Sequence, residues 1–333
     1  MRNAIVIFFE EDDYNTMLEA LFHDLHDNSN VYFVTEKSYP NSIVYRYLHS
    51  KKLRKITFGL SNLLYLKLFF LYYKLPRLIR KLNREYDHVS ILFHSSAVRK
   101  PDYPLKYYKY LKRKASLNLF YLDIHDHLYA CRVANTLVES GIFDKVFTID
   151  PEDAKKYNLI LCSTPYSKLK IEESSKLDKQ LYFCGGENGR AYMLYTIWKK
   201  AKEHEIILKY DLKYAERFMD FFENDVNVSF TDHLPYEEVL KRELSSVCIL
   251  DITQKNQSAF TLRPFEAVVY NKKLLTNNKN IKQFKYYDER YMRYFETAED
   301  IDWDWVKENI PVDYSYEGDF SPIHLLKELT LSN

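Results

Sequence analysis

The stretch Gln257–Asn278, with the sequence QSAFTLRPFEAVVYNKKLLTNN, decides the predicted fold. It begins as a polar loop, continues as a helix that opens around Thr261 and Arg263, and ends in an apolar strand at Lys273–Thr276. Apolar residues recur along the helix and fill the strand, which is typical of elements that pack on a shared core. Polar residues gather at the helix start, where unpaired N–H groups and the helix dipole attract anions. The stretch therefore predicts a helix and a buried strand beside an anion-binding loop.

The polar side chains of this loop and helix start suit a sugar nucleotide. In this interpretation Arg263 and the N–H groups hold the diphosphate, and Glu266 accepts hydrogen bonds from ribose hydroxyls. Gln257 and the hydroxyls of Ser258 and Thr261 complete the loop. The alternative is that Arg263 and Glu266 are ordinary first-turn residues of a helix.

Length and composition narrow the classes of protein that fit. A chain of 333 residues is long enough for two domains, and 46% hydrophobic with 29% charged residues indicates a globular protein. A net charge of +1 and the lack of an RNA-binding motif argue against nucleic acid as a partner. The four cysteines are scattered without metal-ligand spacing, which predicts reduced thiols and a cytoplasmic protein. The first residues do not read as a signal peptide, and no apolar stretch is long enough to predict a transmembrane helix.

Short apolar runs alternate with helical patterns in two successive series, which predicts mainly parallel sheets with crossover helices. A polar segment near Cys162–Lys179 separates the series. We therefore predict an α/β protein with two Rossmann-like doubly wound domains that face each other across a cleft: 1–165 N-terminal and 166–333 C-terminal. The last helix, Ile323–Leu329, is expected to pack back on the first domain. The predicted strands are Ala4–Phe9, Val31–Val34, Val89–His94, Leu117–Leu122, Lys145–Ile149, Gln180–Cys184, Ile206–Lys209, Val226–Phe230, Ser246–Asp251 and Lys273–Thr276.

A second candidate ligand-binding turn follows the predicted strand that ends at Cys184. Gly185 and Gly186 would let the backbone approach a ligand closely, and Arg190 falls in the first helical turn, where a phosphate would lie. The pattern is not GxGxxG, so a tight turn with a solvated arginine is the alternative. Asp251 ends another strand and could orient a donor sugar or the loop, or could only hydrogen-bond backbone in its turn.

These residues together resemble a known family. A strand that ends in Asp251, then Gln-Ser-x-x-Thr-x-Arg-x-x-Glu-Ala, then Lys-Lys-Leu-Leu-Thr-x-Asn, resembles bacterial glycosyltransferases of the GT-B fold that build capsular or lipopolysaccharide chains. The turn GGENGR and the segment Phe143–Leu159 resemble the same group, and the resemblance covers about Leu117–Asn278. This chain departs from the family at Ala259, where a glycine often follows Gln-Ser, so a glycine-dependent loop geometry is in doubt.

The resemblance implies a sugar donor in the C-terminal domain and an acceptor, a glycan or a lipid-linked glycan, in the N-terminal domain. We favour a UDP-sugar as the donor, with no cofactor and no bound metal required. The donor-site residues carried over by position are Arg190, Gln257, Ser258, Thr261, Arg263 and Glu266.

The N-terminal domain would then supply any general base for the acceptor hydroxyl. Asp123 follows a predicted strand and matches an aspartate of the resembling family, although its role is open. Glu11 lies in an acidic run after the first strand. The alternatives are a turn or cap residue for Asp123 and a solvated helix start for Glu11.

Two other patterns are poor metal sites. His125 and His127 lack a third clear ligand, and Asp302 and Asp304 lie where helix capping is the better interpretation. We therefore predict no metal site.

The segment Lys51–Arg84 contains ten Lys or Arg residues and no acidic residue, interleaved with Leu, Phe and Tyr. Such a segment could lie against an anionic membrane surface, which would suit a lipid-linked acceptor. The alternative is a buried helix whose charged ends extend into water.

Other functions stay open at this point. A polyol-phosphate transferase or a sugar-nucleotide epimerase could use the same fold, and a non-catalytic partner of a glycan assembly complex could bind a sugar nucleotide or a membrane. The reaction product distinguishes the enzymes, and activity of the purified chain alone would exclude the non-catalytic partner.

Overall fold

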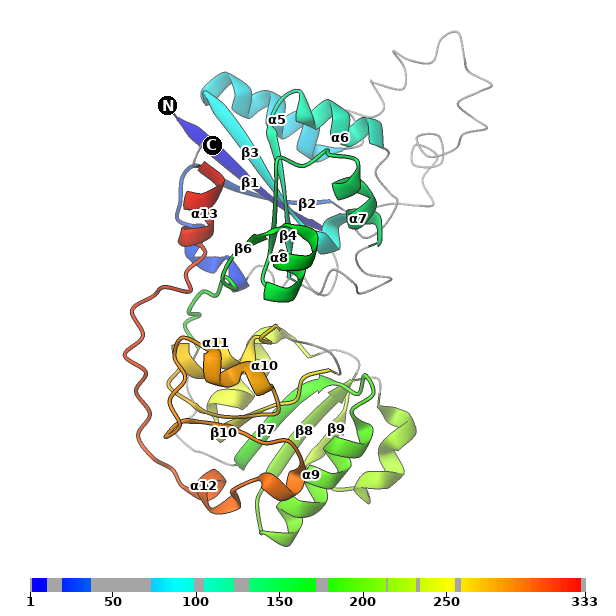
Figure 1. The fold of residues 1–333 in the computed structure, drawn as a ribbon, viewed down its shortest axis with the longest axis vertical. Helices are drawn as coiled ribbons and strands as arrows, with labels where there is room; N and C mark the ends of the chain where they lie inside the picture. The colour runs from blue at the N-terminus through cyan, green and yellow to red at the C-terminus, as the bar shows by residue number, and fades with distance from the viewer. Residues whose placement is uncertain are drawn as a thin grey trace. The chain divides into compact units, whose positions relative to one another are not determined.

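The structure is a computed structural model that describes residues 2–10, 20–36, 73–98, 105–122, 132–171, 179–213, 215–231, 234–254 and 259–330. The chain divides into two compact units (Figure 1). Unit 1 comprises residues 1–18, 24–165 and 322–333, and unit 2 comprises residues 19–23 and 166–321. The chain therefore passes between the units on either side of residues 19–23, again at Pro165–Tyr166 and again at Ser321–Pro322.

Unit 1 contains a parallel six-stranded sheet with the order β2-β1-β3-β4-β5-β6. Its strands are β1 (Asn3–Glu10), β2 (Val31–Glu36), β3 (His88–His94), β4 (Ser116–Tyr121), β5 (Lys145–Thr148) and β6 (Ile160–Leu161). Its helices are α5 (Lys74–Glu85), α6 (Leu105–Lys112), α7 (Arg132–Glu139), α8 (Pro151–Tyr157) and α13 (Ile323–Thr330). The central strands are mainly apolar, as expected for a parallel sheet that is covered on both faces, although Ser90 of β3 and Asn118 of β4 are also buried.

Local sequence explains where α8 begins and ends. The Asp150 side chain accepts hydrogen bonds from the N–H groups of Glu152 and Asp153 at 2.8 and 2.9 Å. Pro151 occupies the first helical position, where a missing N–H costs nothing. Asn158 ends the helix in the left-handed region, with φ of 53°.

The last helix belongs to unit 1. Within that unit Lys145 Nζ donates to the carbonyl oxygen of Glu328 in α13 at 2.8 Å. Leu325, Leu326 and Leu329 of this helix are buried.

Unit 2 contains a second parallel six-stranded sheet with the order β12-β11-β10-β7-β8-β9. Counted from β7, this is the 3-2-1-4-5-6 order of a dinucleotide-binding Rossmann sheet. Its strands are β7 (Lys179–Gly186), β8 (Leu208–Lys213), β9 (Val228–Phe230), β10 (Ser246–Asp251), β11 (Lys273–Thr276) and β12 (Met292–Tyr294). Its helices are α9 (Ala191–Glu203), α10 (Tyr236–Leu244), α11 (Arg263–Val269) and α12 (Trp303–Lys307), with 3-10 turns at Glu216–Phe222, Lys279–Gln283 and Ala298–Asp300.

The predicted α/β class with two doubly wound units is confirmed, with local differences. The predicted helix after β8 is a 3-10 helix, Glu216–Phe222, whose Phe222 fills the core of unit 2. Strands β6 and β12 were not predicted, because each is very short and lies at an edge of its sheet. Among the described residues, no helix is long and apolar enough to span a lipid bilayer.

Candidate functional site

The predicted nucleotide-site residues of unit 2 gather where the strand order of its sheet reverses. The chain runs outward from β7 to β8 and β9, and then returns to β10 on the other side of β7. In open α/β sheets, ligands bind at the carboxyl ends of the strands at this switch point. Gly185 and Gly186 end β7, Asp251 ends β10, and Arg190 and Arg263 follow them in the chain.

Arg190 joins the two sides of the switch point. Its Nη2 donates to the carbonyl oxygen of Gly186, and its Nη1 donates to that of Ile252, just beyond β10. Its Nε donates to Glu187 O at 3.3 Å. Burial lowers the pKa of Arg190, while Asp251 and Glu187 act in the opposite direction. The predicted turn at Gly185–Arg190 therefore lies beside the predicted site after β10.

The glycine turn is tight, as the sequence predicts. A Cβ atom at Gly185 would lie 2.9 Å from Cζ of Phe183, so a side chain there would displace a buried ring. Gly189 has φ of 79°, a conformation that favours glycine.

The start of α9 is occupied by a residue that sequence reasoning missed. The Glu187 carboxylate accepts from the N–H groups of Gly189 at 3.0 Å and Ala191 at 3.3 Å. Arg217 Nη2 lies 2.9 Å from the same carboxylate. A carboxylate is thus bonded to N–H groups where the sequence predicted a phosphate, and an acid directly before Asn-Gly at a helix start was the available signal.

Asp251 lies at the centre of a polar cluster at the end of β10. Its side chain is 2% exposed and accepts from Thr261 Oγ1 at 2.9 Å and from Thr276 Oγ1 at 2.7 Å. Burial raises the pKa of Asp251, although the two threonine hydroxyls and nearby arginines oppose this shift. Thr261 Oγ1 also accepts from the Arg263 N–H at 3.2 Å, so the same hydroxyl satisfies the first N–H group of α11. Asp251 thus fixes the start of α11 through side chains and does more than bond backbone in its turn.

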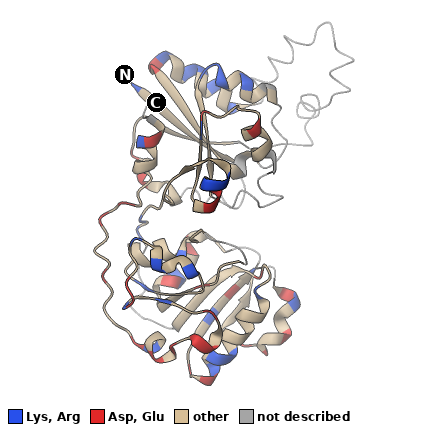
Figure 2. Ribbon diagram, in the orientation of Figure 1, with Lys and Arg blue, Asp and Glu red and all other residues tan. Residues whose placement is uncertain are grey.

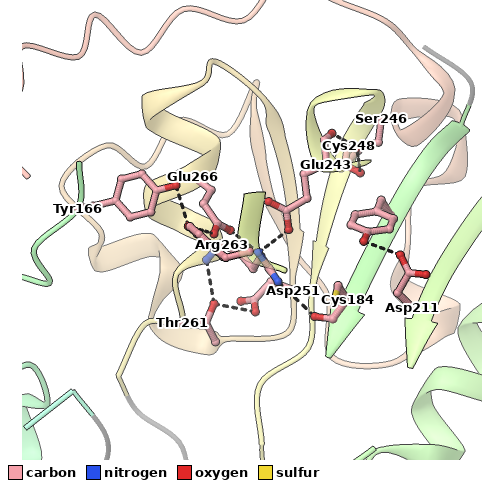
Figure 3. Close-up of polar contacts among 12 residues, drawn as sticks. Tyr166, Cys184, Asp211, Glu243, Ser246, Cys248, Asp251, Thr261, Arg263 and Glu266 are labelled. Carbon is pink, nitrogen blue, oxygen red and sulfur yellow. Dashed lines mark hydrogen bonds and ion pairs between the residues drawn. The ribbon is translucent and has the colours of Figure 1, made fainter. Parts of the chain in front are cut away.

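Two acids and a carbonyl oxygen surround the Arg263 side chain, which is 16% exposed (Figure 3). Its Nη1 contacts Glu243 Oε1 and lies 2.6 Å from Glu266 Oε2, and its Nη2 donates to Cys184 O at 3.2 Å. Burial alone would lower the pKa of Arg263, but the two glutamates raise it well above its ordinary value. The guanidinium therefore stays charged and ties α10, α11 and the end of β7 together.

Glu266 is equally enclosed. It is 0% exposed, and its second oxygen accepts from Tyr236 OH at 2.7 Å. Tyr236 OH lies 2.9 Å from Tyr166 OH, and Tyr166 begins the main segment of unit 2, residues 166–321. Contact of Arg263 with a diphosphate and of Glu266 with a ribose stays a prediction, and it requires the present contacts to rearrange.

Other predicted residues are placed as follows. Gln257, Ser258, Glu11, Asp123, His125 and His127 lie outside the described residues. Asp302 accepts from the Trp305 N–H at 3.0 Å and caps α12, which confirms the capping interpretation of Asp302–Asp304.

Glu243 gives this cluster a pH-dependent stability. Burial, and then the negative charge of Glu266, raise its pKa well above the ordinary value of 4.5, although Arg263 opposes the shift. The folded protein therefore holds a proton that the unfolded chain releases above about pH 4.5, so this contribution to stability is lost as pH rises.

We expect Glu243→Gln to remove this dependence. From about pH 4.5 up to the raised pKa of Glu243 in the folded protein, the free energy of unfolding of the variant should gain about 1.4 kcal/mol per pH unit relative to the unmodified protein. Urea titrations of both proteins at several pH values measure the difference. A difference that does not change with pH would contradict a protonated Glu243.

Comparisons with known proteins bear on the fold. No protein-family model matches the sequence, and no curated protein matches it. Among solved structures, a UDP-N-acetylglucosamine 2-epimerase matches at a TM-score of 0.52 and 11% identity, covering 99% of this chain and 96% of that chain. S. aureus MnaA, in a co-structure with UDP, matches at a TM-score of 0.51 and 10% identity. The match covers 100% of this chain and 99% of MnaA. TarM matches at 0.46 and 11% identity over 69% of this chain and 50% of TarM, so this chain spans half of TarM.

The likeness to the epimerase and to MnaA shows that the chain has their fold. Together with the two parallel six-stranded sheets, it confirms the predicted GT-B-like α/β architecture.

Proposed function

We propose that this protein is a glycosyltransferase that takes a sugar from a nucleotide diphosphate, with a UDP-sugar favoured, and transfers it to a cell-surface glycan or lipid-linked acceptor. The observation that carries the proposal is the convergence of the turn after β7 and the segment after β10 at the switch point of unit 2, joined by Arg190. A ligand at this place would meet backbone at Gly185 and Gly186 and a guanidinium at Arg190.

Arg190 would act on the leaving diphosphate. Three of its five N–H groups donate to described carbonyls, which leaves two for a ligand. A partly buried guanidinium beside the departing diphosphate stabilises the charge that develops as the glycosidic bond breaks. Gln257 and Ser258 would complete the donor site from the segment between β10 and α11, and Thr261 would hold the start of α11.

Unit 1 would bind the acceptor. Asp123 and Glu11 are the proposed candidates for the group that accepts the proton of the attacking hydroxyl. Asp123 follows β4 and Glu11 follows β1, and the carboxyl ends of parallel strands are where such folds place functional groups.

A sugar-nucleotide epimerase is the second candidate. The observation that favours it is the likeness of the whole chain to a UDP-N-acetylglucosamine 2-epimerase fold at a TM-score of 0.52. Fold alone does not select between epimerisation and transfer, because both need a bound nucleotide sugar.

One reaction panel distinguishes the two. The purified chain is incubated with UDP-N-acetylglucosamine and other sugar nucleotides, with and without glycan acceptors, and the products are separated by chromatography. Free UDP together with a new glycosidic bond supports transfer. An epimeric sugar nucleotide formed without acceptor would replace transfer by the second candidate, and binding without any product would favour a non-catalytic partner.

A membrane contact through unit 1 is also proposed, and α5 and α6 define where it would lie. The apolar residues Leu75, Ile79 and Leu82 of α5 are buried in the core, so the described part of 51–84 offers charge to a membrane, not these apolar side chains. Asn83 Nδ2 donates to Lys114 O at 2.9 Å, which places the end of α5 beside the residues after α6. Lys and Arg line α5 and also occur on and just after α6 (Figure 2): Lys74, Arg77, Arg80, Lys81, Arg84, Lys109, Lys112, Arg113 and Lys114.

Replacing Arg77 and Lys81 together by glutamate is expected to weaken binding to phosphatidylglycerol vesicles by at least roughly 30-fold, because loss of each basic residue alone removes about 1 kcal/mol and the added negative charges repel the lipid. Co-sedimentation measures the change, and added salt should release the unmodified protein. The matched control replaces the exposed Lys279 and Lys282 of unit 2 by glutamate. Equal binding to anionic and neutral vesicles would contradict the proposed contact.

A further inference from the structure

One partly buried cation in unit 2, Arg263, contacts two buried carboxyl groups (Figure 3). Arg263 Nη1 contacts both Glu243 Oε1 and Glu266 Oε2. Glu243 is 1% exposed and Glu266 is 0% exposed. If both acids were ionised, two negative charges would face the single positive charge of Arg263. An excess of charge is unfavourable where the carboxyl groups are buried.

The two acids are not equivalent. Glu266 also accepts a hydrogen bond from Tyr236 OH, so both of its oxygens are engaged as carboxylate acceptors. Within the described part of the chain, the ion contact with Arg263 is the only polar contact between the Glu243 carboxyl group and a hydrogen-bond donor. The less satisfied carboxyl is the one that holds the proton, which matches the raised pKa of Glu243.

Titratable groups from each neighbouring element face Glu243. Their charges or hydroxyls act on the Glu243 carboxyl group, and one of them is a further acid at the end of β10. These groups are Tyr236 of α10, Tyr182 and Cys184 of β7, Asp251 of β10, Arg263 and Glu266 of α11, and Tyr270 just after α11.

We infer that Glu243 is the exchange partner of Arg263: when Glu266 turns to a bound nucleotide sugar, Glu243 gives up its proton and keeps Arg263 paired. This inference rests on the proposed function, because it assumes that Glu266 accepts hydroxyls of the ligand. Without a second acid, the turn of Glu266 would leave the partly buried guanidinium of Arg263 with no carboxylate partner, and this is unfavourable. Glu243 is thus a positioning residue that makes Glu266 available.

The protons balance as follows. In the free protein Glu243 is a neutral acid and Glu266 is the carboxylate that pairs with Arg263. In the complex Glu243 is the carboxylate on Arg263, and Glu266 accepts from ligand hydroxyls. One proton leaves Glu243 for the solvent, and no other bond forms or breaks within the protein triad.

Calorimetric titration with UDP-N-acetylglucosamine in buffers of different ionisation enthalpy tests this release. Above pH 7 the diphosphate of UDP-N-acetylglucosamine, which is esterified at both ends, stays fully ionised, so the ligand itself takes up and releases no proton. The unmodified protein should release about one proton more per bound ligand than Glu243→Gln, whose side chain cannot ionise. Glu237→Gln, an exposed acid on the same helix, is the matched control and should release as many protons as the unmodified protein.

A second readout covers the case in which Glu243→Gln binds too weakly to titrate. The affinity of the unmodified protein should then rise with pH, by up to tenfold per pH unit, and Glu243→Gln should bind at least tenfold more weakly than Glu237→Gln. Binding with no proton release and no pH dependence would overturn the exchange while leaving the proposed function in place. Failure of the folded, unmodified protein to bind any sugar nucleotide would overturn the proposed function and the exchange with it.

Discussion

Replacing Arg263 by alanine is expected to cost unit 2 about 3–5 kcal/mol of stability, the largest effect of any single substitution considered for this protein. The substitution leaves the Glu243 and Glu266 carboxyls buried without their shared cation, and the carbonyl of Cys184 loses a donor. Removing one partner of a buried ion cluster costs more than the cluster contributes, because the remaining charges stay desolvated.

Tryptophan fluorescence during urea unfolding measures this loss in unit 2 alone. All three tryptophans of the chain, Trp198, Trp303 and Trp305, belong to this unit. Arg263→Lys is the matched control. It keeps the charge but lacks the planar guanidinium that reaches both acids and Cys184 O, so its free energy of unfolding should lie between those of Arg263→Ala and the unmodified protein. If Arg263→Ala unfolds at the same urea concentration as the unmodified protein, the buried cluster does not hold unit 2 together.

The second large effect is expected at Asp251. Alanine at this position leaves the hydroxyls of Thr261 and Thr276 without their acceptor inside the protein and should cost about 2–4 kcal/mol. Because Thr261 also accepts from the first N–H group of α11, the substitution should weaken nucleotide binding as well.

Asp251→Asn removes the negative charge but keeps the shape of the side chain, so it separates the two contributions to stability. The asparagine oxygen can still accept from one threonine, and a neutral amide is easier to bury than a carboxylate. We therefore expect Asp251→Asn to lose less than half of the stability that Asp251→Ala loses, as measured by the same fluorescence titration. Equal losses in the two variants would show that the charge of Asp251, and not its hydrogen bonds, fixes the start of α11.

Local sequence patterns predicted the strand and the helix that flank the site, but not the contacts between its side chains. The strand that ends at Asp251 and the helix that starts at Arg263 follow from an apolar run, a polar loop and a second apolar pattern. Neither the burial of Arg263 nor its partner Glu243 follows from such patterns, because Glu243 lies on α10, twenty positions earlier, and reads as an ordinary helix-end acid.

The same reason explains why Glu187 and Tyr166 were missed. The Glu187 carboxylate replaces the expected anion at α9 only because Asn188 and Gly189 adopt positive φ and turn the N–H groups toward it. Tyr166 precedes the recognisable elements of unit 2, and its link to Glu266 through Tyr236 exists only after the chain has folded. These contacts join residues that are distant in the sequence, so a local sequence pattern does not predict them.

The most direct test of the central claim, that a nucleotide diphosphate binds at the switch point of unit 2, is hydrogen–deuterium exchange with and without UDP. The account predicts slower exchange in the turn from Gly185 to Ala191 and in the segment between β10 and α11, and little change along α12. Protection confined to unit 1, or absent from both of these segments under saturating UDP, would contradict it.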